Sequence, residues 1–112
     1  MKHTFTIKQN DTLPTFQVTE MAYGDGTPVI FASGDAAVFN LRIANDRSAD
    51  KKVDGGPVEL EEGTSNCTYA WQIGDTDTVG KYVAEVEVTF ASGGVATWPN
   101  DSHFIVHVTN DV

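Results

Sequence analysis

The amino-acid sequence predicts an all-β domain, a sandwich of roughly seven to nine short antiparallel strands. Apolar and polar residues alternate with a period of two, most clearly from Tyr82 to Phe90, and this period places them on opposite faces of a strand. No segment has the apolar spacing i, i+3, i+4, i+7 of an amphipathic helix over three turns. Turn-forming residues recur about every ten positions, a spacing typical of sandwiches.

In the first part of the chain, strands are expected at Thr4–Lys8, Thr15–Tyr23, Pro28–Phe31 and Ala36–Ala44. Gly24-Asp25-Gly26 is expected to form a tight hairpin turn, because glycine adopts positive φ without steric cost. The inward-facing residues predicted for the fourth strand are Ala37, Phe39, Leu41 and Ile43. Asn45–Gly56 is polar and lacks periodicity, so we expect an exposed loop there.

In the second part, strands are expected at Val58–Leu60, Asn66–Ile73, Tyr82–Phe90, Val95–Trp98 and Phe104–Val108. Gly55-Gly56-Pro57 is expected to precede the first of these strands, and Ser92-Gly93-Gly94 to form a hairpin turn. The residues predicted to face inward from Asn66–Ile73 are Cys67, Tyr69, Trp71 and Ile73.

Length and composition favour one folded domain, spanning residues 1–112, with 40% hydrophobic residues. Seven basic and sixteen acidic residues give a net charge of −9, which argues against a nucleic-acid partner because phosphate binding needs a positive surface. No apolar run approaches the length of a membrane span. Cys67 is the sole cysteine, so no intrachain disulfide is expected. The segment that begins with Met1 lacks the features of a signal peptide.

The segment from Gly80 to Ala84 has the form of a tyrosine corner. In this motif a tyrosine near the start of a sandwich strand donates a hydrogen bond to the backbone of the preceding loop, a role that we assign to Tyr82. Gly80 is expected to permit the bend before the strand, and Trp71 to lie on the strand before the loop. These features indicate an immunoglobulin-like β-sandwich. It differs from antibody domains in having Ala84 where they carry their second bridging cysteine.

Three segments carry a family resemblance. They are Trp71…Gly74-Asp75-Thr76-Asp77-Thr78…Gly80…Tyr82 with its following strand, Phe5-Thr6-Ile7-Lys8-Gln9-Asn10-Asp11-Thr12-Leu13-Pro14, and Thr97-Trp98-Pro99-Asn100-Asp101. Together they resemble the Ig-like domain of tailed-bacteriophage baseplate upper proteins and of small phage tail or virion structural proteins. The resemblance implies a non-enzymatic virion protein of the tail, baseplate, neck or capsid surface. Such a protein is made in the bacterial cytoplasm and docks onto other virion proteins or onto copies of itself.

Asp75 and Asp77 could belong to a metal site, since Asp75-Thr-Asp77-Thr-Val-Gly80 matches the first half of an EF-hand loop. An EF-hand also needs an oxygen ligand at its fifth position and a glutamate at its twelfth, where this chain has Val79 and Val86. We therefore favour a turn stabilised by its own side chains, with calcium as the alternative. No cofactor is expected.

No catalytic arrangement is evident, so we do not expect an enzyme. His103 and His107 are four residues apart on a predicted strand, roughly 13 Å, too far for one metal ion. Glu85 and Glu87 alternate with apolar residues, which indicates a solvated acidic face more than a catalytic pair. Cys67 is expected to be a small core residue.

Two segments are candidate interfaces: the turn Trp98, Pro99, Asn100 and Asp101, and the loop residues Asp46 and Arg47. Trp98 fits either a core position under the loop or an interface anchor. The alternative function is a carbohydrate- or host-surface-binding module that uses Trp98, Trp71 or Tyr69 as a stacking platform. That alternative requires at least one exposed tryptophan, and two buried tryptophans would remove it.

Overall fold

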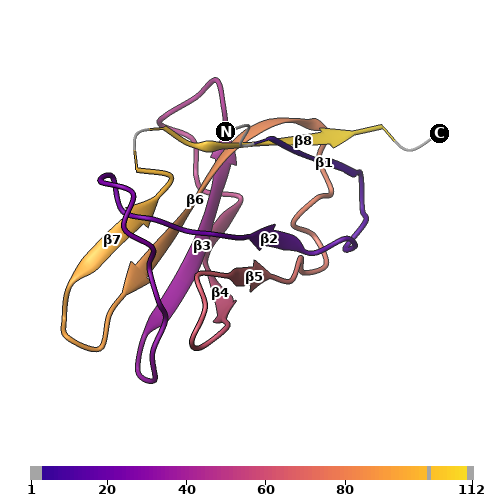
Figure 1. Ribbon diagram of the computed structural model, residues 1–112. Coiled ribbons are helices and arrows are strands. Elements are labelled where there is room, and N and C mark those ends of the chain that lie inside the picture. The colour runs from indigo at the N-terminus through magenta and orange to yellow at the C-terminus, as the bar shows by residue number, and fades with distance from the viewer. Residues whose placement is uncertain (1–3, 101, 111–112) are drawn as a thin grey trace.

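The computed structural model describes residues 4–100 and 102–110, which form eight β-strands and no helix (Figure 1). The strands are β1 (Thr4–Lys8), β2 (Phe16–Val18), β3 (Ala36–Ile43), β4 (Val53–Leu60), β5 (Cys67–Tyr69), β6 (Gly80–Thr89), β7 (Val95–Trp98) and β8 (Phe104–Thr109). The all-β prediction is confirmed. The bounds of β1 and β7 coincide with the predicted ones, and those of β3 and β6 agree to within two residues.

The strands are hydrogen-bonded in the order β1-β8-β6-β3-β4-β5-β2, and β7 pairs with β6 beyond the end of β8. The sheet curls into an incomplete barrel (Figure 1). β4 helps to produce this curl because it changes neighbour along its length: Val53–Val58 pairs with β3, and Glu59–Leu60 pairs with β5. A register shift between Phe39 and Leu41 adds to the bend, since irregular pairing increases local twist.

One strand pair corrects the expectation of a purely antiparallel fold. β1 lies parallel to β8, with Thr4 opposite Ile105 and Lys8 opposite Thr109, whereas the other strand pairs are antiparallel. A parallel pair needs a crossover, and here nearly the whole chain separates the two strands. Local sequence patterns could not indicate this pairing.

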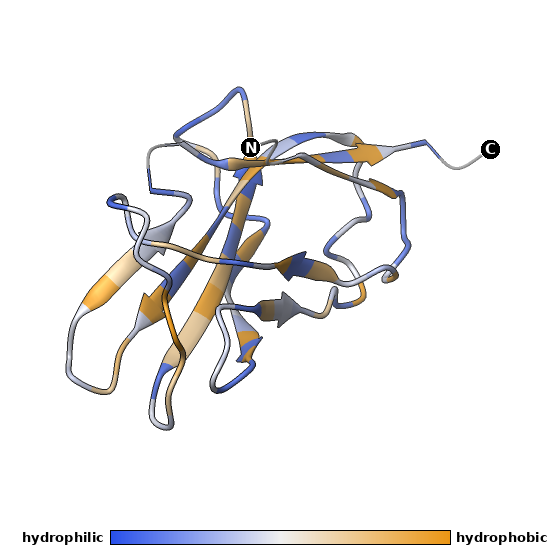
Figure 2. Cartoon of the chain, viewed as in Figure 1, coloured by the Kyte–Doolittle hydropathy of each residue, from blue (hydrophilic) through white to orange (hydrophobic). Residues whose placement is uncertain are grey.

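The core lies inside the curled sheet, where alternate residues of the strands point inward. Figure 2 shows this alternation of apolar and polar residues along β3 and β6. Phe39 lies at the centre, stacked on Tyr69 at a ring separation of 4.4 Å and edge-on to Trp71 at 5.5 Å. The ring centroid of Phe16 lies 5.1 Å from that of Phe39 and 5.3 Å from that of Phe104. Such contacts add to the stabilisation from burial alone.

The predicted loop Asn45–Gly56 is shorter than expected, because β4 already begins at Val53. Gly55 and Gly56 lie inside this strand, although glycine is uncommon in strand interiors. A Cβ atom on Gly56 would lie 2.6 Å from Cε1 of Tyr69. Glycine at this position therefore allows Tyr69 to approach the backbone of β4. The strand was not predicted here because Gly55 and Gly56 interrupt the alternation of apolar and polar residues.

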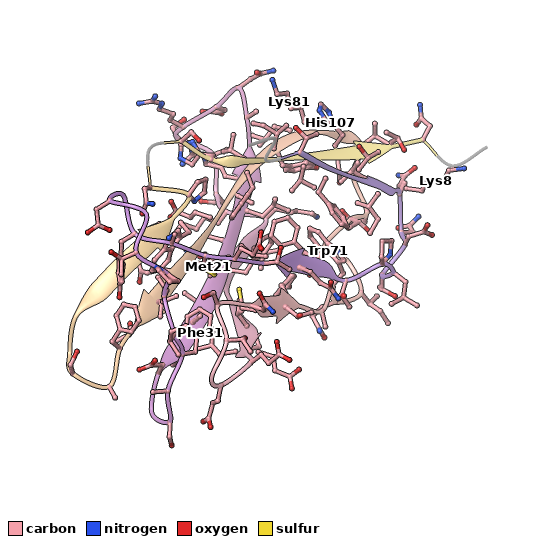
Figure 3. All side chains as sticks on the ribbon, viewed as in Figure 1. Lys8, Met21, Phe31, Trp71, Lys81 and His107 are labelled. Atoms are coloured by element: carbon pink, nitrogen blue, oxygen red, sulfur yellow. The ribbon has the colours of Figure 1, made fainter. Side chains whose placement is uncertain are left out.

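The predicted strands Thr15–Tyr23 and Pro28–Phe31 were mostly wrong. Only Phe16–Val18 is a strand, and residues 19–31 form an irregular hairpin with one bridge, between Ala22 and Pro28. Met21 and Phe31, labelled in Figure 3, are buried, as is Val29. The apolar pattern in this segment thus marks core residues correctly but not a regular strand.

The predicted strand Asn66–Ile73 is also shorter, because only Cys67–Tyr69 pairs as β5. Trp71 is buried as expected, whereas Ile73 is 99% exposed and does not face the core. The alternation fails after Trp71 because the chain turns there, with Gly74 at a φ of 97°.

Candidate functional site

The hydroxyl of Tyr82 donates a hydrogen bond of 2.7 Å to the carbonyl oxygen of Thr78. This is the bond that the tyrosine-corner interpretation predicts, and it fixes the loop before β6 to the first residues of that strand. Burial raises the pKa of Tyr82. Gly80 does not supply the bend, contrary to expectation. It is paired with Val108 in the β6–β8 ladder, and the positive φ in the loop belongs to Gly74.

Asp75 and Asp77 both accept hydrogen bonds from neighbouring groups. Asp75 Oδ2 accepts from the Tyr69 hydroxyl at 2.5 Å and from the Gln72 backbone N–H at 2.8 Å. Asp77 Oδ1 accepts from Lys52 Nζ at 2.5 Å and from Thr78 Oγ1 at 2.8 Å. These contacts fit the interpretation of a turn held by its own side chains.

The same contacts shift the pKa values of Asp77 and Tyr69. The hydrogen bond from Lys52, and then that from Thr78, lowers the pKa of Asp77. Burial, together with the Asp75 carboxylate, raises the pKa of Tyr69 above its ordinary value. Across residues 4–100 and 102–110, no three His, Cys, Asp or Glu side chains lie together as metal ligands would. The two aspartates thus form no larger acidic cluster within that part of the chain.

The loop 72–79 is also attached to the loop 9–14. Thr76 contributes two of the connecting bonds: its carbonyl oxygen accepts from Asn10 N–H at 2.9 Å, and its hydroxyl donates to Asp11 O at 2.8 Å. Gln9 Nε2 donates to Asp77 O at 2.8 Å. We call these two loops the loop end; they carry Leu13, which is 71% exposed, and the exposed Ile73. This surface was not predicted from the sequence, because alternation places Ile73 in the core.

Trp98 belongs to the core and is not an exposed interface anchor. Its side chain is 4% exposed, and its Nε1–H donates to the carbonyl oxygen of Ala22 at 2.7 Å. Asn100 Nδ2 donates to the same oxygen at 3.1 Å. Pro99 is buried as well, so of this predicted interface only Asn100 is exposed, and Asp101 lies outside the described residues. The turn holds the hairpin 19–31 against β7.

Asp46 and Arg47 are both exposed, as their assignment to an interface loop requires. Asp46 Oδ1 accepts hydrogen bonds from the hydroxyl and the backbone N–H of Ser48, and these bonds lower the pKa of Asp46. No hydrogen bond or ion pair joins these two residues to the described part of the Trp98 turn.

The stacking platform of the alternative function is not present. Trp71 and Trp98 are each 4% exposed, and Tyr69 is 2% exposed. A sugar ring stacks only on an accessible aromatic face, so none of these three side chains can bind a glycan in this way. The alternative requires an exposed tryptophan, and this requirement is not met because both indoles pack into aromatic clusters.

The candidate catalytic residues lie on the outer face of the sheet and in the core. Glu85 and Glu87 are half-buried on β6, which is a central strand. His107 lies opposite Lys81 and beside it in Figure 3. Cys67 is buried, and its burial raises the pKa of the thiol to about 11. Its thiol is therefore not a thiolate nucleophile at neutral pH.

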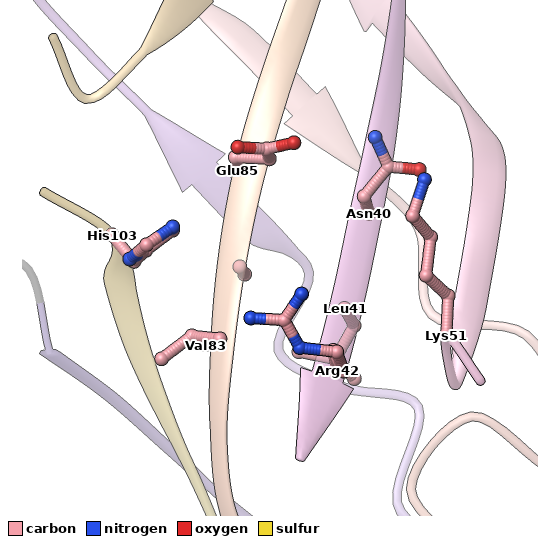
Figure 4. A pocket seen from close by; sticks show the side chains of 8 residues that line it. Asn40, Leu41, Arg42, Lys51, Val83, Glu85 and His103 are labelled. Carbon is pink, nitrogen blue, oxygen red and sulfur yellow. The ribbon is translucent and has the colours of Figure 1, made fainter. Parts of the chain in front are cut away.

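One small open pocket on the outer face was not predicted. It has a volume of about 50 Å³, and its lining includes Asn40, Arg42, Lys51, Glu85 and His103. Figure 4 shows Arg42 extending from β3 toward β6, which carries Glu85, with His103 beyond β6. Glu85 and His103 were considered separately from the sequence, because local patterns do not show that β6 brings Glu85 between Arg42 on β3 and His103 next to β8.

Comparison with known proteins gives no match: no protein-family model fits the chain, and no curated protein or solved structure is significantly similar to it. The described residues include no helix with the length and apolar character needed to cross a membrane.

Proposed function

We propose that this chain is a non-enzymatic structural protein of a tailed-phage virion and that its domain is a variant of the Ig-like sandwich. The tyrosine-corner hydrogen bond and the three sequence segments that resemble phage Ig-like domains support this proposal. The protein is made in the bacterial host cytoplasm and becomes part of the tail, baseplate, neck or capsid surface. It acts by docking onto other virion proteins.

The observation that carries the docking role is the loop end. Three hydrogen bonds hold its two loops together, yet Leu13 and Ile73 are exposed. Apolar side chains on a firmly held support lose little conformational entropy on binding, and their burial against a partner removes apolar surface from water. The loop end therefore has the properties of a protein-docking surface.

The test is to purify phage particles on a density gradient and to quantify this chain in them by mass spectrometry. We expect it to sediment with the particles at a constant ratio to the major virion proteins. Recovery in the soluble lysate alone would contradict the proposal. An Ile73→Asp variant should be incorporated at least about tenfold less, whereas Ile30→Asp, also exposed but on the hairpin 19–31, should be incorporated normally.

A further inference from the structure

The outer face of β3 and β6 carries two opposite charges that do not pair with each other. Arg42 lies opposite Val83 in the β3–β6 ladder, and Asn40 lies opposite Glu85. Arg42 and Glu85 are therefore diagonal neighbours. Lys51–Asp54 and Lys52–Asp77 are the two ion pairs within 4.0 Å in the described part of the chain, so neither Arg42 nor Glu85 belongs to one.

Arg42 is held in a position that leaves part of its guanidinium unsatisfied. Its Nε atom is buried and has no hydrogen-bond partner among residues 4–100 and 102–110. The intermediate burial of Arg42 leaves part of its side chain accessible, and a carboxylate is the acceptor that best fits a guanidinium. The neighbouring Asn40 side chain is already used, since its Oδ1 accepts from the Gly55 N–H at 2.8 Å.

The surroundings of Arg42 resemble the centre of a protein interface. Val83 and Ile105 form a half-buried apolar row beside it across β6 and β8. Arginine next to apolar groups is typical of interface centres. The pocket of about 50 Å³ between Arg42, Glu85 and His103 has room for a group the size of a carboxylate.

Charge complementarity favours a second copy of this chain as the partner. Glu85 would repel a purely acidic partner, and Arg42 would repel a purely basic one. A second copy presents both charges. A two-fold axis midway between the two residues places Arg42 of each copy against Glu85 of the other, as in a self-complementary interface.

We propose that two copies associate face to face through the outer face of β3 and β6, with reciprocal ion pairs between Arg42 and Glu85. This inference deepens the proposed docking function, on which it rests, but it uses a face distinct from the loop end. The net negative charge of the chain makes two copies repel each other at long range. The paired charges at the centre of the face determine how the two copies are oriented in the dimer.

The experiment is sedimentation equilibrium of the native chain, of the Arg42→Glu variant and of the Glu85→Arg variant, each alone. The two variants are also measured together as an equimolar mixture. The native chain should dimerise, and each variant alone should dimerise roughly a hundredfold more weakly, because like charges then face each other. The mixture should recover dimers of one copy of each variant, because both contacts then join opposite charges. A structural role for either residue would not produce this recovery.

The matched controls are Lys8→Glu and Glu59→Arg, which make the same charge changes at exposed positions on β1 and β4. They should dimerise like the native chain. Circular dichroism shows whether each variant folds. Where a charge-reversal variant does not fold, Arg42→Ala or Glu85→Ala takes its place. These alanine variants should also dimerise more weakly than the native chain.

A native chain that stays monomeric, a mixture of folded variants that stays monomeric, or equal loss in the controls would overturn the proposal. Dimerisation without incorporation into particles would contradict the proposed function and leave this inference standing. Incorporation without dimerisation would contradict this inference and leave the proposed function standing. The two failures are therefore distinguishable.

Discussion

The Tyr82 hydroxyl and the Trp98 indole show how single polar groups in this domain hold irregular segments to the sheet. Each side chain is buried, and each donates one hydrogen bond to a loop carbonyl oxygen. A buried donor needs such a partner, so these bonds determine where the two loops lie. The Tyr82 bond reaches four residues back, whereas the Trp98 bond reaches Ala22, 76 residues away.

Tyr82→Phe removes one hydrogen bond and keeps the ring in the core. We expect the variant to lose about 1–2 kcal/mol of unfolding free energy, because the Thr78 carbonyl oxygen loses its donor. Urea unfolding at pH 7 measures the loss. The matched change Tyr23→Phe, at an exposed ring whose hydroxyl makes no hydrogen bond to the described residues, should stay within about 0.5 kcal/mol. Equal losses in the two variants would contradict this role for Tyr82.

Gly56→Ala tests the close approach of Tyr69 to β4. The new methyl group would lie 2.6 Å from Cε1 of Tyr69 and 2.9 Å from Cγ1 of Val53, so one of these side chains must move. We expect a loss of about 1–3 kcal/mol, as in other overpacked cores, in thermal or urea unfolding. Gly24→Ala, where no atom lies within 4 Å of the added carbon, is the control and should have little effect.

At the scale of elements, the hairpin 19–31 is the least regular part of the structure. It is attached by backbone hydrogen bonds from Met21 N–H to Ser65 O and from Phe31 N–H to Thr64 O, both 3.0 Å. The Trp98 bond to Ala22 adds a contact to β7. This element closes part of the barrel without becoming a strand, so its stability depends on these few bonds and on its buried side chains.

Trp98→Phe should therefore loosen this hairpin more than the rest of the sheet. The variant keeps an aromatic ring but loses the donor to Ala22, and we expect a global loss of about 1–3 kcal/mol. Hydrogen exchange provides the local measurement. The Val29 amide donates to Met21 O at 2.9 Å, and the free energy of opening that its exchange reports should fall by more than the global loss of unfolding free energy. The Val88 amide in β6 should change by the global loss alone. Equal changes at both amides would contradict the local effect.

At the scale of the whole molecule, hydrogen-bonded carboxylates set the response to acid. Asp35 joins two distant segments, since its two oxygens accept from the Ala32 and Ala91 N–H groups, both at 2.9 Å. These bonds lower the pKa of Asp35 below its ordinary value of 3.8. Its stabilising contribution is thus present above that ordinary value and is lost as the pH falls through the lowered one.

Asp35→Asn should accordingly be less stable than the native chain at pH 7, and the difference should narrow as the pH falls below 3.8. Thermal unfolding across this range measures it. Glu59→Gln, at a carboxylate that accepts no hydrogen bond from the described residues, should show a constant small difference. A constant difference for Asp35→Asn as well would exclude a link to its ionisation.

Predictions from sequence succeeded where apolar and polar residues alternate over a long strand. β6 and β3 were identified nearly to their ends because neither contains a glycine between the first residue and the last. β4 was missed in part, since Gly55 and Gly56 interrupt its pattern. Ile73 was placed in the core because alternation alone does not reveal where a strand stops.

The candidate site was predictable only where its contacts are local. Alternation and the tyrosine-corner pattern, both read from nearby residues, determine the all-β class and the bond from Tyr82 to Thr78. Only tertiary structure decides the parallel pairing of β1 with β8, the burial of Trp98 against Ala22, and the diagonal placement of Arg42 and Glu85 on neighbouring strands. The physical reason is that side-chain periodicity records which face of a strand is buried, but not which distant strand lies next to it.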